Sequence, residues 1–200
     1  MKGYTHLLGG LAAAGVAISL HAPHPMTLLA AAGAGSLLPD WDLPQSWMGR
    51  WIPWPAVAAS RGGRLPPRVG RAGWPHPIWH RHQGHSVAGV ALASGIAAWL
   101  AAFASHAAGL RNLSPFWVAA GLFLGGISHL ALDGFNDERQ WWLWPLTRRG
   151  FRWPLHAGVR YTDQAASAVL SAVLIVLAWH LGHPWLRDLS QLPPTDKVLP

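Results

Sequence analysis

The sequence predicts an all-α protein, a polytopic membrane bundle of about five apolar helices. Hydrophobic residues make up 51% of the 200 residues and charged residues only 12%, whereas a typical soluble domain has about 25% charged residues. The apolar stretches at residues 86–110 and 164–181 are close to the roughly 20 residues with which a helix crosses a bilayer. A third stretch, at residues 116–132, is slightly shorter and carries no charged side chain.

The beginning of the chain predicts a helical hairpin. Two apolar runs, at residues 7–20 and 26–38, are separated by a short segment with two histidines and two prolines. At about 1.5 Å per residue each run covers only about 20 Å, so the hairpin is either re-entrant or needs its flanks to span. Lys2 before an apolar run also fits a cleaved signal peptide, but prolines stand where a small-residue cleavage site is needed. We therefore keep the segment in the mature protein.

The whole chain, residues 1–200, is predicted to form one membrane-embedded domain. Ser86 is the expected N-cap of the long helix that follows it, because its hydroxyl can accept a hydrogen bond from the first turn. The loop at residues 43–79 and the tail at 182–200 could be mobile. Residues 49–75 are rich in glycine, proline and arginine, which predicts no regular structure.

Arginine residues crowd two loops, and loops with excess positive charge stay on the cytoplasmic side of a membrane. With both loops inside, the amino terminus is also cytoplasmic, and the turns at residues 21–25 and 109–115 lie outside. The two arginine groups are Arg50, Arg61, Arg64, Arg68, Arg71 and Arg81, and Arg139, Arg148, Arg149, Arg152 and Arg160.

Histidines and aspartates stand at the cytoplasmic ends of the predicted helices. His129 and Asp133 are four residues apart in an apolar run, which places them on one helix face about a turn apart. Asp40 and Asp42 lie between two prolines, which favour an extended segment with both carboxylates on the same side. The candidate metal ligands are His6, Asp40, Asp42, His80, His85, His129, Asp133 and Asp163.

Each candidate also has a simpler interpretation, because a single buried histidine or aspartate in a membrane protein often makes only a helix-to-helix hydrogen bond. The convergence of several on one membrane face favours a metal site, with a proton relay or transport pathway as the main alternative. The chain has no cysteine, so its ligands are imidazole and carboxylate, a set that suits zinc or a similar divalent ion. His80 and His85 are five residues apart and cannot share a helix face, so His80 is a loop ligand or an indirect one.

Five segments together resemble one family. GYTHLLGG, GSLLPDWD, HRHQGHS, SHLALDGFN and WPLTRRGFRWP have the order and spacing found in the membrane-bound metal-dependent hydrolases, also described as LexA-binding, inner-membrane-associated hydrolases. The resemblance spans nearly the whole chain and implies a metal-dependent hydrolase of the inner membrane. The family's motif positions correspond to His6, Asp40, Asp42, His80, Arg81, His85, Ser86, His129 and Asp133.

Two segments of this chain differ from the family pattern. His82 and Gly84 stand where the family's HRGxTHS segment has a glycine and a threonine. Asp163, one methylene shorter, is the nearest match to a late glutamate that follows the WP segment. The family is also distantly similar to zinc-dependent phospholipase C and to helical nucleases that bind a cluster of zinc ions.

The reaction predicted for such a site is hydrolysis of a phosphoester. One divalent ion, or two or more close together, can lower the pKa of a bound water and neutralise a phosphoryl oxygen. Asp40 or Asp42 could bridge ions or accept the proton of the water, while His85, His129 and Asp133 hold metal. Arg81 could bind a phosphate in a bidentate manner, and it could equally be a cytoplasmic anchor.

The positions of the tryptophans in the sequence indicate which class of substrate the site could act on. Ten of the fourteen lie in or beside the two arginine-rich loops, and tryptophan with arginine favours the interface of an anionic leaflet. A lipid phosphate is therefore a reasonable substrate, although a simple aromatic belt explains the same pattern. A nucleic acid is unlikely because no known binding motif accompanies the basic residues.

Three classes of function remain: a membrane metallohydrolase, a metal or proton transporter, and a non-catalytic regulatory membrane protein with a degenerate site.

Overall fold

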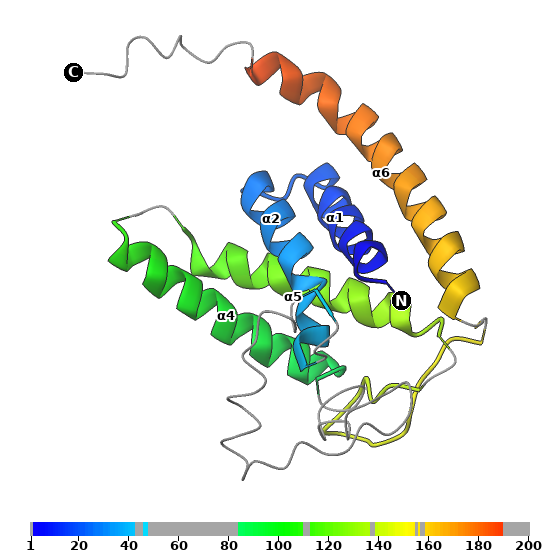
Figure 1. Cartoon of the computed structure of the whole chain (residues 1–200). Helices are drawn as coiled ribbons and strands as arrows, with labels where there is room; N and C mark the ends of the chain where they lie inside the picture. Colours follow the sequence, from blue (N-terminus) through cyan, green and yellow to red (C-terminus); the bar gives the residue numbers. More distant parts are fainter. Residues whose placement is uncertain are drawn as a thin grey trace.

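The computed structural model describes residues 2–42, 46–47, 84–109, 113–136, 139–154, 156 and 159–189. This part of the chain is helical, as predicted, and its elements run in sequence order (Figure 1). They are α1 (Gly3–Ser19), α2 (Pro25–Gly35), the 3-10 helix η1 (Leu38–Asp42), α4 (Val87–Ala107), α5 (Pro115–Asp133) and α6 (Val159–Leu189).

Local sequence signals explain most of the helix boundaries. Ser86 is the N-cap of α4 and its hydroxyl accepts a hydrogen bond of 2.9 Å from the backbone N–H of Gly89, which confirms the predicted cap. Pro25 and Pro115 begin α2 and α5, where the missing N–H of proline is no loss. Between α1 and α2 the backbone turns through His24, whose φ is 56°, so the hairpin is present as predicted.

One prediction about local structure needs correction, and the last helix extends beyond its apolar stretch. The segment around Asp40 was expected to be extended, but it forms the 3-10 helix η1, in which residues two apart point in different directions. Pro39 suits this helix because it falls in the first turn, where no backbone donor is needed. The last helix is longer than the apolar stretch at residues 164–181, because α6 continues to Leu189. The mobility of the tail at residues 182–200 stays a prediction, and residues 190–200 lie outside the described residues.

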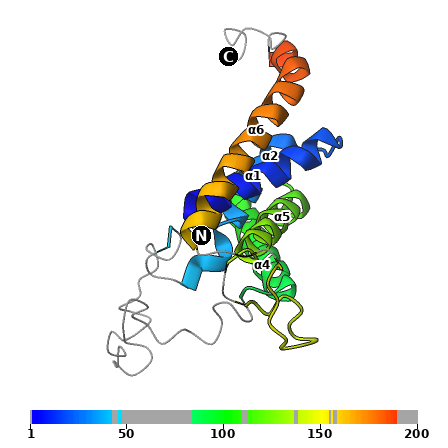
Figure 2. The same cartoon turned by 90° about the vertical axis from the view of Figure 1, so that its right-hand side faces the viewer.

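Helix α5 lies in the middle of the fold and packs against α1, α2 and α4, while α6 packs against α1 (Figures 1 and 2). The α2–α5 interface consists of small residues. A side chain at Gly125 would collide with the backbone oxygen of Ala32, and one at Gly35 would collide with the backbone of Leu122. Glycine therefore lets these two helices approach closely, as small residues do at helix interfaces in membranes.

Three helical segments are long and apolar enough to cross a membrane: Val87–Ala107, Pro115–Asp133 and Tyr161–His180. The outer helices α4 and α6 carry large apolar side chains on their surfaces, including Leu92, Trp99, Ile175 and Trp179. Such a surface is stable in lipid and unstable in water. The central helix α5 is the most buried of the three, as expected for a helix surrounded by others.

The described part of the second arginine-rich loop, residues 139–154, folds back against one end of this bundle (Figure 2). Gln140 and Phe151 exchange two backbone hydrogen bonds, of 2.8 and 2.9 Å. The indole N–H of Trp153 donates to the carbonyl of Ala131 at 2.9 Å, and the N–H of Val87 donates to the carbonyl of Trp142 at 3.0 Å. The loop is thereby bonded to the end of α5 and the start of α4.

Candidate metal centre

The last turn of α5 supplies two of the candidate ligands. His129 and Asp133 are both buried, and their side chains lie on one helix face as their spacing predicted. His129 Nε2 is 3.6 Å from Asp133 Oδ2.

The other ring nitrogen of His129 fixes the tautomer of the imidazole. His129 Nδ1 lies 2.7 Å from the backbone carbonyl oxygen of Ser36, at the end of α2. A carbonyl can only accept a hydrogen bond, so Nδ1 carries a proton, and in the neutral form that binds metal the ring directs the lone pair of Nε2 toward the carboxylate. Metal-ligating histidines in proteins are commonly held in this way.

Helix α1 brings His6 to the same point. The His6 ring stacks on the His129 ring with centroids 3.7 Å apart, and His6 Nε2 lies 3.3 Å from Asp133 Oδ1. Because Gly9 and Gly10 approach Leu132 and Ala32 closely, α1 can lie near enough to α5 and α2 for this stacking.

The two remaining members come from segments that are distant in sequence. His85 precedes α4, and its Nε2 lies 3.5 Å from Asp40 Oδ1 and 3.8 Å from Asp133 Oδ2. Asp40 Oδ1, from η1, is also 3.6 Å from His129 Nε2. The side chain of Asp40 is 20% exposed, whereas those of the other four are 0–3% exposed, so the cluster reaches the surface at Asp40.

These five residues form two overlapping groups that could hold a metal ion. One is His6, His129 and Asp133, and the other is Asp40, His85 and His129. Within each group the ligand atoms lie within 4.8 Å of one another, and His129 belongs to both. The structure therefore provides donors for one ion or for two adjacent ions.

The electrostatics of the cluster favour a cation at its centre. Among the described residues, His129 Nε2 and both ring nitrogens of His6 are buried without a hydrogen-bond partner. The Nε2 atoms of His6 and His129 face carboxylate oxygens of Asp133 at 3.3 and 3.6 Å, and two acceptors at such a distance repel each other unless a proton or a metal ion lies between them. Uncompensated buried polar atoms of this kind are costly.

The pKa values of His85 and Asp40, which lie outside the three membrane-spanning helices, are shifted. Desolvation by burial lowers the pKa of the His85 imidazole below its usual 6.5 and outweighs the opposing hydrogen bond and charge of Asp40. Burial also opposes ionisation of Asp40, but the charge of His129 and the hydrogen bond from His85 outweigh it and hold the pKa of Asp40 below its ordinary range. A neutral imidazole beside an ionised carboxylate is the protonation state that binds metal.

A residue that the sequence analysis did not single out holds Asp133 in place. The amide of Asn136 donates to Asp133 Oδ1 at 2.8 Å, and its own oxygen accepts a hydrogen bond of 3.2 Å from the Thr162 hydroxyl of α6. Asn136 is 1% exposed. The sequence did contain a signal for this role: Asn136 follows Asp133 by three residues at the end of the helix, where its side chain can reach back to the carboxylate.

Asp163 belongs to neither group, and its carboxylate is engaged at the start of α1. It accepts hydrogen bonds from the Lys2 backbone N–H at 2.9 Å, the Tyr4 hydroxyl at 3.1 Å and the Thr5 hydroxyl at 2.6 Å. A carboxylate at a helix N-terminus satisfies otherwise unpaired donors and complements the helix dipole. Asp163 thus anchors α1 beside α6, and the role of a direct metal ligand stays a prediction for it.

Three of the predicted residues cannot be placed in the site. His80 and Arg81 lie outside the described residues, as does the side chain of Asp42. Their proposed roles as ligand, phosphate contact and bridging or basic carboxylate stay predictions.

Comparison with known proteins bears on the membrane assignment. The model of the YdjM inner membrane protein family matches residues 1–187. The chain belongs to the YdjM inner membrane protein family. No curated protein and no solved structure matches it. As a member of the YdjM family it is a membrane protein, in agreement with its three long apolar helices.

Proposed function

We propose that the cluster is a zinc centre that hydrolyses a phosphoester with a metal-activated water. The observation that carries this proposal is the spacing of the ligand atoms. Five nitrogen–oxygen pairs from five residues measure 3.3–3.8 Å. Two ligand atoms at about 2.0–2.1 Å from a tetrahedral zinc ion lie about 3.4 Å apart. The nitrogen and oxygen atoms of the cluster therefore already have nearly the separation that a bound ion requires.

The side chains have different tasks in this proposal. His85, His129 and Asp133 hold the ion, with His129 oriented by the Ser36 carbonyl and Asp133 by Asn136. Asp40 is the partly exposed member, so its side of the ion is the side open to water and substrate. A bound divalent ion would lower the pKa of a coordinated water to about 7 and neutralise a phosphoryl oxygen.

Two residues without a described side-chain position complete the proposal. Asp42 would accept the proton of the water, which needs a carboxylate within hydrogen-bond reach. Arg81 would neutralise the phosphate, since its guanidinium fork matches two phosphate oxygens. The positive-inside rule supports a cytoplasmic position for these groups and for the site.

The position of the cluster along the helices favours an enzyme over a transporter. His6 lies in the first turn of α1, His129 and Asp133 lie in the last turns of α5, and His85 precedes α4. All are at helix ends, whereas substrate and ion sites in secondary transporters are typically near the bilayer midplane.

Metal analysis combined with hydrolysis tests the proposal. We expect the detergent-purified protein to contain zinc and to hydrolyse p-nitrophenyl phosphate, and we expect His85→Ala to lose both. His106→Ala is the matched control, because His106 lies near the C-terminal end of α4, at the opposite end of the helix from His85. Zinc uptake into vesicles without turnover would instead support transport, and a protein that binds no metal would refute the centre.

A further inference from the structure

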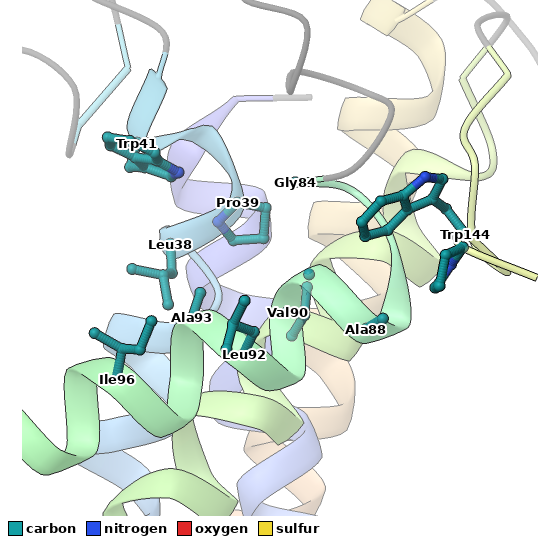
Figure 3. Close-up of a pocket in the computed structure, with 12 residues that line it drawn as sticks. Leu38, Pro39, Trp41, Gly84, Ala88, Val90, Leu92, Ala93, Ile96 and Trp144 are labelled. Atoms are coloured by element: carbon teal, nitrogen blue, oxygen red, sulfur yellow. The ribbon is translucent and has the colours of Figure 1, made fainter.

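An apolar groove of about 360 Å³ lies beside the segments that carry Asp40 and His85. Its lining comes from η1, from the first turns of α4 and from Trp144 and Pro145 of the loop, and its described lining residues are all apolar or aromatic (Figure 3). Its volume falls within the range of ligand-binding pockets.

The groove lies beside two of the segments that carry metal ligands. Pro39 and Trp41, which flank Asp40, line it, and so does Gly84, which precedes His85. Asp40 is the one member of the cluster with appreciable exposure, at 20%. A molecule in the groove therefore lies beside the chain neighbours of Asp40 and His85.

The other end of the groove is continuous with the membrane-facing surface of α4. Leu92 and Ile96, which line it, are 67% and 52% exposed and belong to a helix that can span the bilayer. Figure 3 shows them on the same side of α4 as Ala93, below Leu38 of η1. An uncharged lining that opens toward lipid favours hydrocarbon over any polar ligand.

We propose that this groove binds the hydrocarbon chain of a membrane phospholipid whose phosphoester reaches the cluster at Asp40. The proposal rests on the proposed function for the reaction and names the substrate class: an amphiphile with an apolar chain and a phosphate headgroup. The chain fixes the position of the headgroup, and burial of each methylene contributes to selection of long-chain over soluble substrates.

Photolabelling tests the groove without requiring turnover. The full chain is placed in phosphatidylcholine nanodiscs with a phospholipid that carries a diazirine on its acyl chain, and crosslinks are mapped by peptide. The indole of Ala93→Trp should fill part of the groove and displace about two methylenes of the lipid acyl chain. The weaker binding of the chain should lower the labelling of residues 84–96 about tenfold. Ala91→Trp is the matched control, since Ala91 is exposed on α4 and does not line the groove.

Labelling of α6 serves as the internal reference, because its apolar side chains contact lipid regardless of the groove. Equal loss in both tryptophan variants, or no loss in Ala93→Trp, overturns the proposal. If Ala93→Trp fails to fold, Ala88→Phe takes its place, since Ala88 also lines the groove.

Hydrolysis then links the groove to the reaction. We expect Ala93→Trp to raise the ratio of KM for dioleoyl phosphatidic acid to KM for p-nitrophenyl phosphate about tenfold, and Ala91→Trp to leave the hydrolysis of both substrates unchanged. An equal effect on both substrates contradicts a chain-binding role. If the wild type hydrolyses neither phosphoester, the proposed function fails, while the labelling result still decides whether the groove binds a lipid chain.

Discussion

The substitution Asp133→Asn distinguishes between two interpretations of the cluster, a metal centre and a network of buried ion pairs. Asp133 touches three imidazoles at 3.3–3.8 Å and accepts a hydrogen bond from Asn136. The substitution keeps the shape of the side chain and removes its charge, so it changes the electrostatics of the cluster with little change in packing.

The expected loss in zinc affinity follows from the number of ligands. A structural zinc site provides about 10–16 kcal/mol of binding free energy, and removal of one of about four ligands should cost about 3 kcal/mol, or about a hundredfold in affinity. The measurement is competition with a chromophoric zinc chelator in detergent micelles at fixed pH.

The metal-free protein should behave differently from the zinc complex. An amide at the position of Asp133 Oδ2 can donate to the lone pair of His129 Nε2, which the carboxylate cannot do. We therefore expect the metal-free melting temperature of Asp133→Asn to match or exceed that of the wild type. If the residues instead formed only a charged pair, the substitution would cost about 3–5 kcal/mol, which corresponds to a loss of about 10 °C. That loss, with zinc affinity unchanged, would refute the metal assignment.

Three further predictions concern the surroundings of the cluster. Asn136→Ala should weaken zinc binding about 10–100-fold, as loss of a group that orients a ligand does, and an unchanged affinity by chelator competition would contradict its orienting role. Asp163→Asn should retain zinc and lower the melting temperature, because the carboxylate bonds the start of α1; loss of zinc with no loss of stability would instead identify Asp163 as a ligand. Because the pKa of His85 is lowered in the folded protein, the unfolded chain binds more protons than the native one below about pH 6.5. The metal-free protein should therefore lose stability between pH 7 and pH 5. His85→Gln should reduce this pH dependence of the melting temperature in thermal scans.

Much of the site could be predicted because its chemistry is local in the sequence. The i, i+4 spacing of His129 and Asp133 fixes their common helix face. The positive-inside rule and the lengths of the apolar runs placed His6, Asp40 and His85 at the same end of the bundle, and the structure brings these five residues together.

The features that were missed depend on tertiary packing. The 3-10 turn of η1 was mistaken for an extended segment, because proline is compatible with both. The hydrogen bond between Thr162 and Asn136, and the position of the Asp163 carboxylate at the start of α1, become visible only when α6 is placed beside α1 and near the segment that follows α5. The groove likewise combines η1, α4 and the loop, and no single segment of the sequence encodes it.

The most direct test of the central claim is zinc K-edge X-ray absorption of the wild-type protein, purified from cells grown with adequate zinc. The account predicts stoichiometric zinc bound by nitrogen and oxygen at about 2.0–2.1 Å, with imidazole scattering that decreases in His129→Gln. Protein that is folded and free of metal, or zinc whose spectrum is the same in His129→Gln, would contradict it.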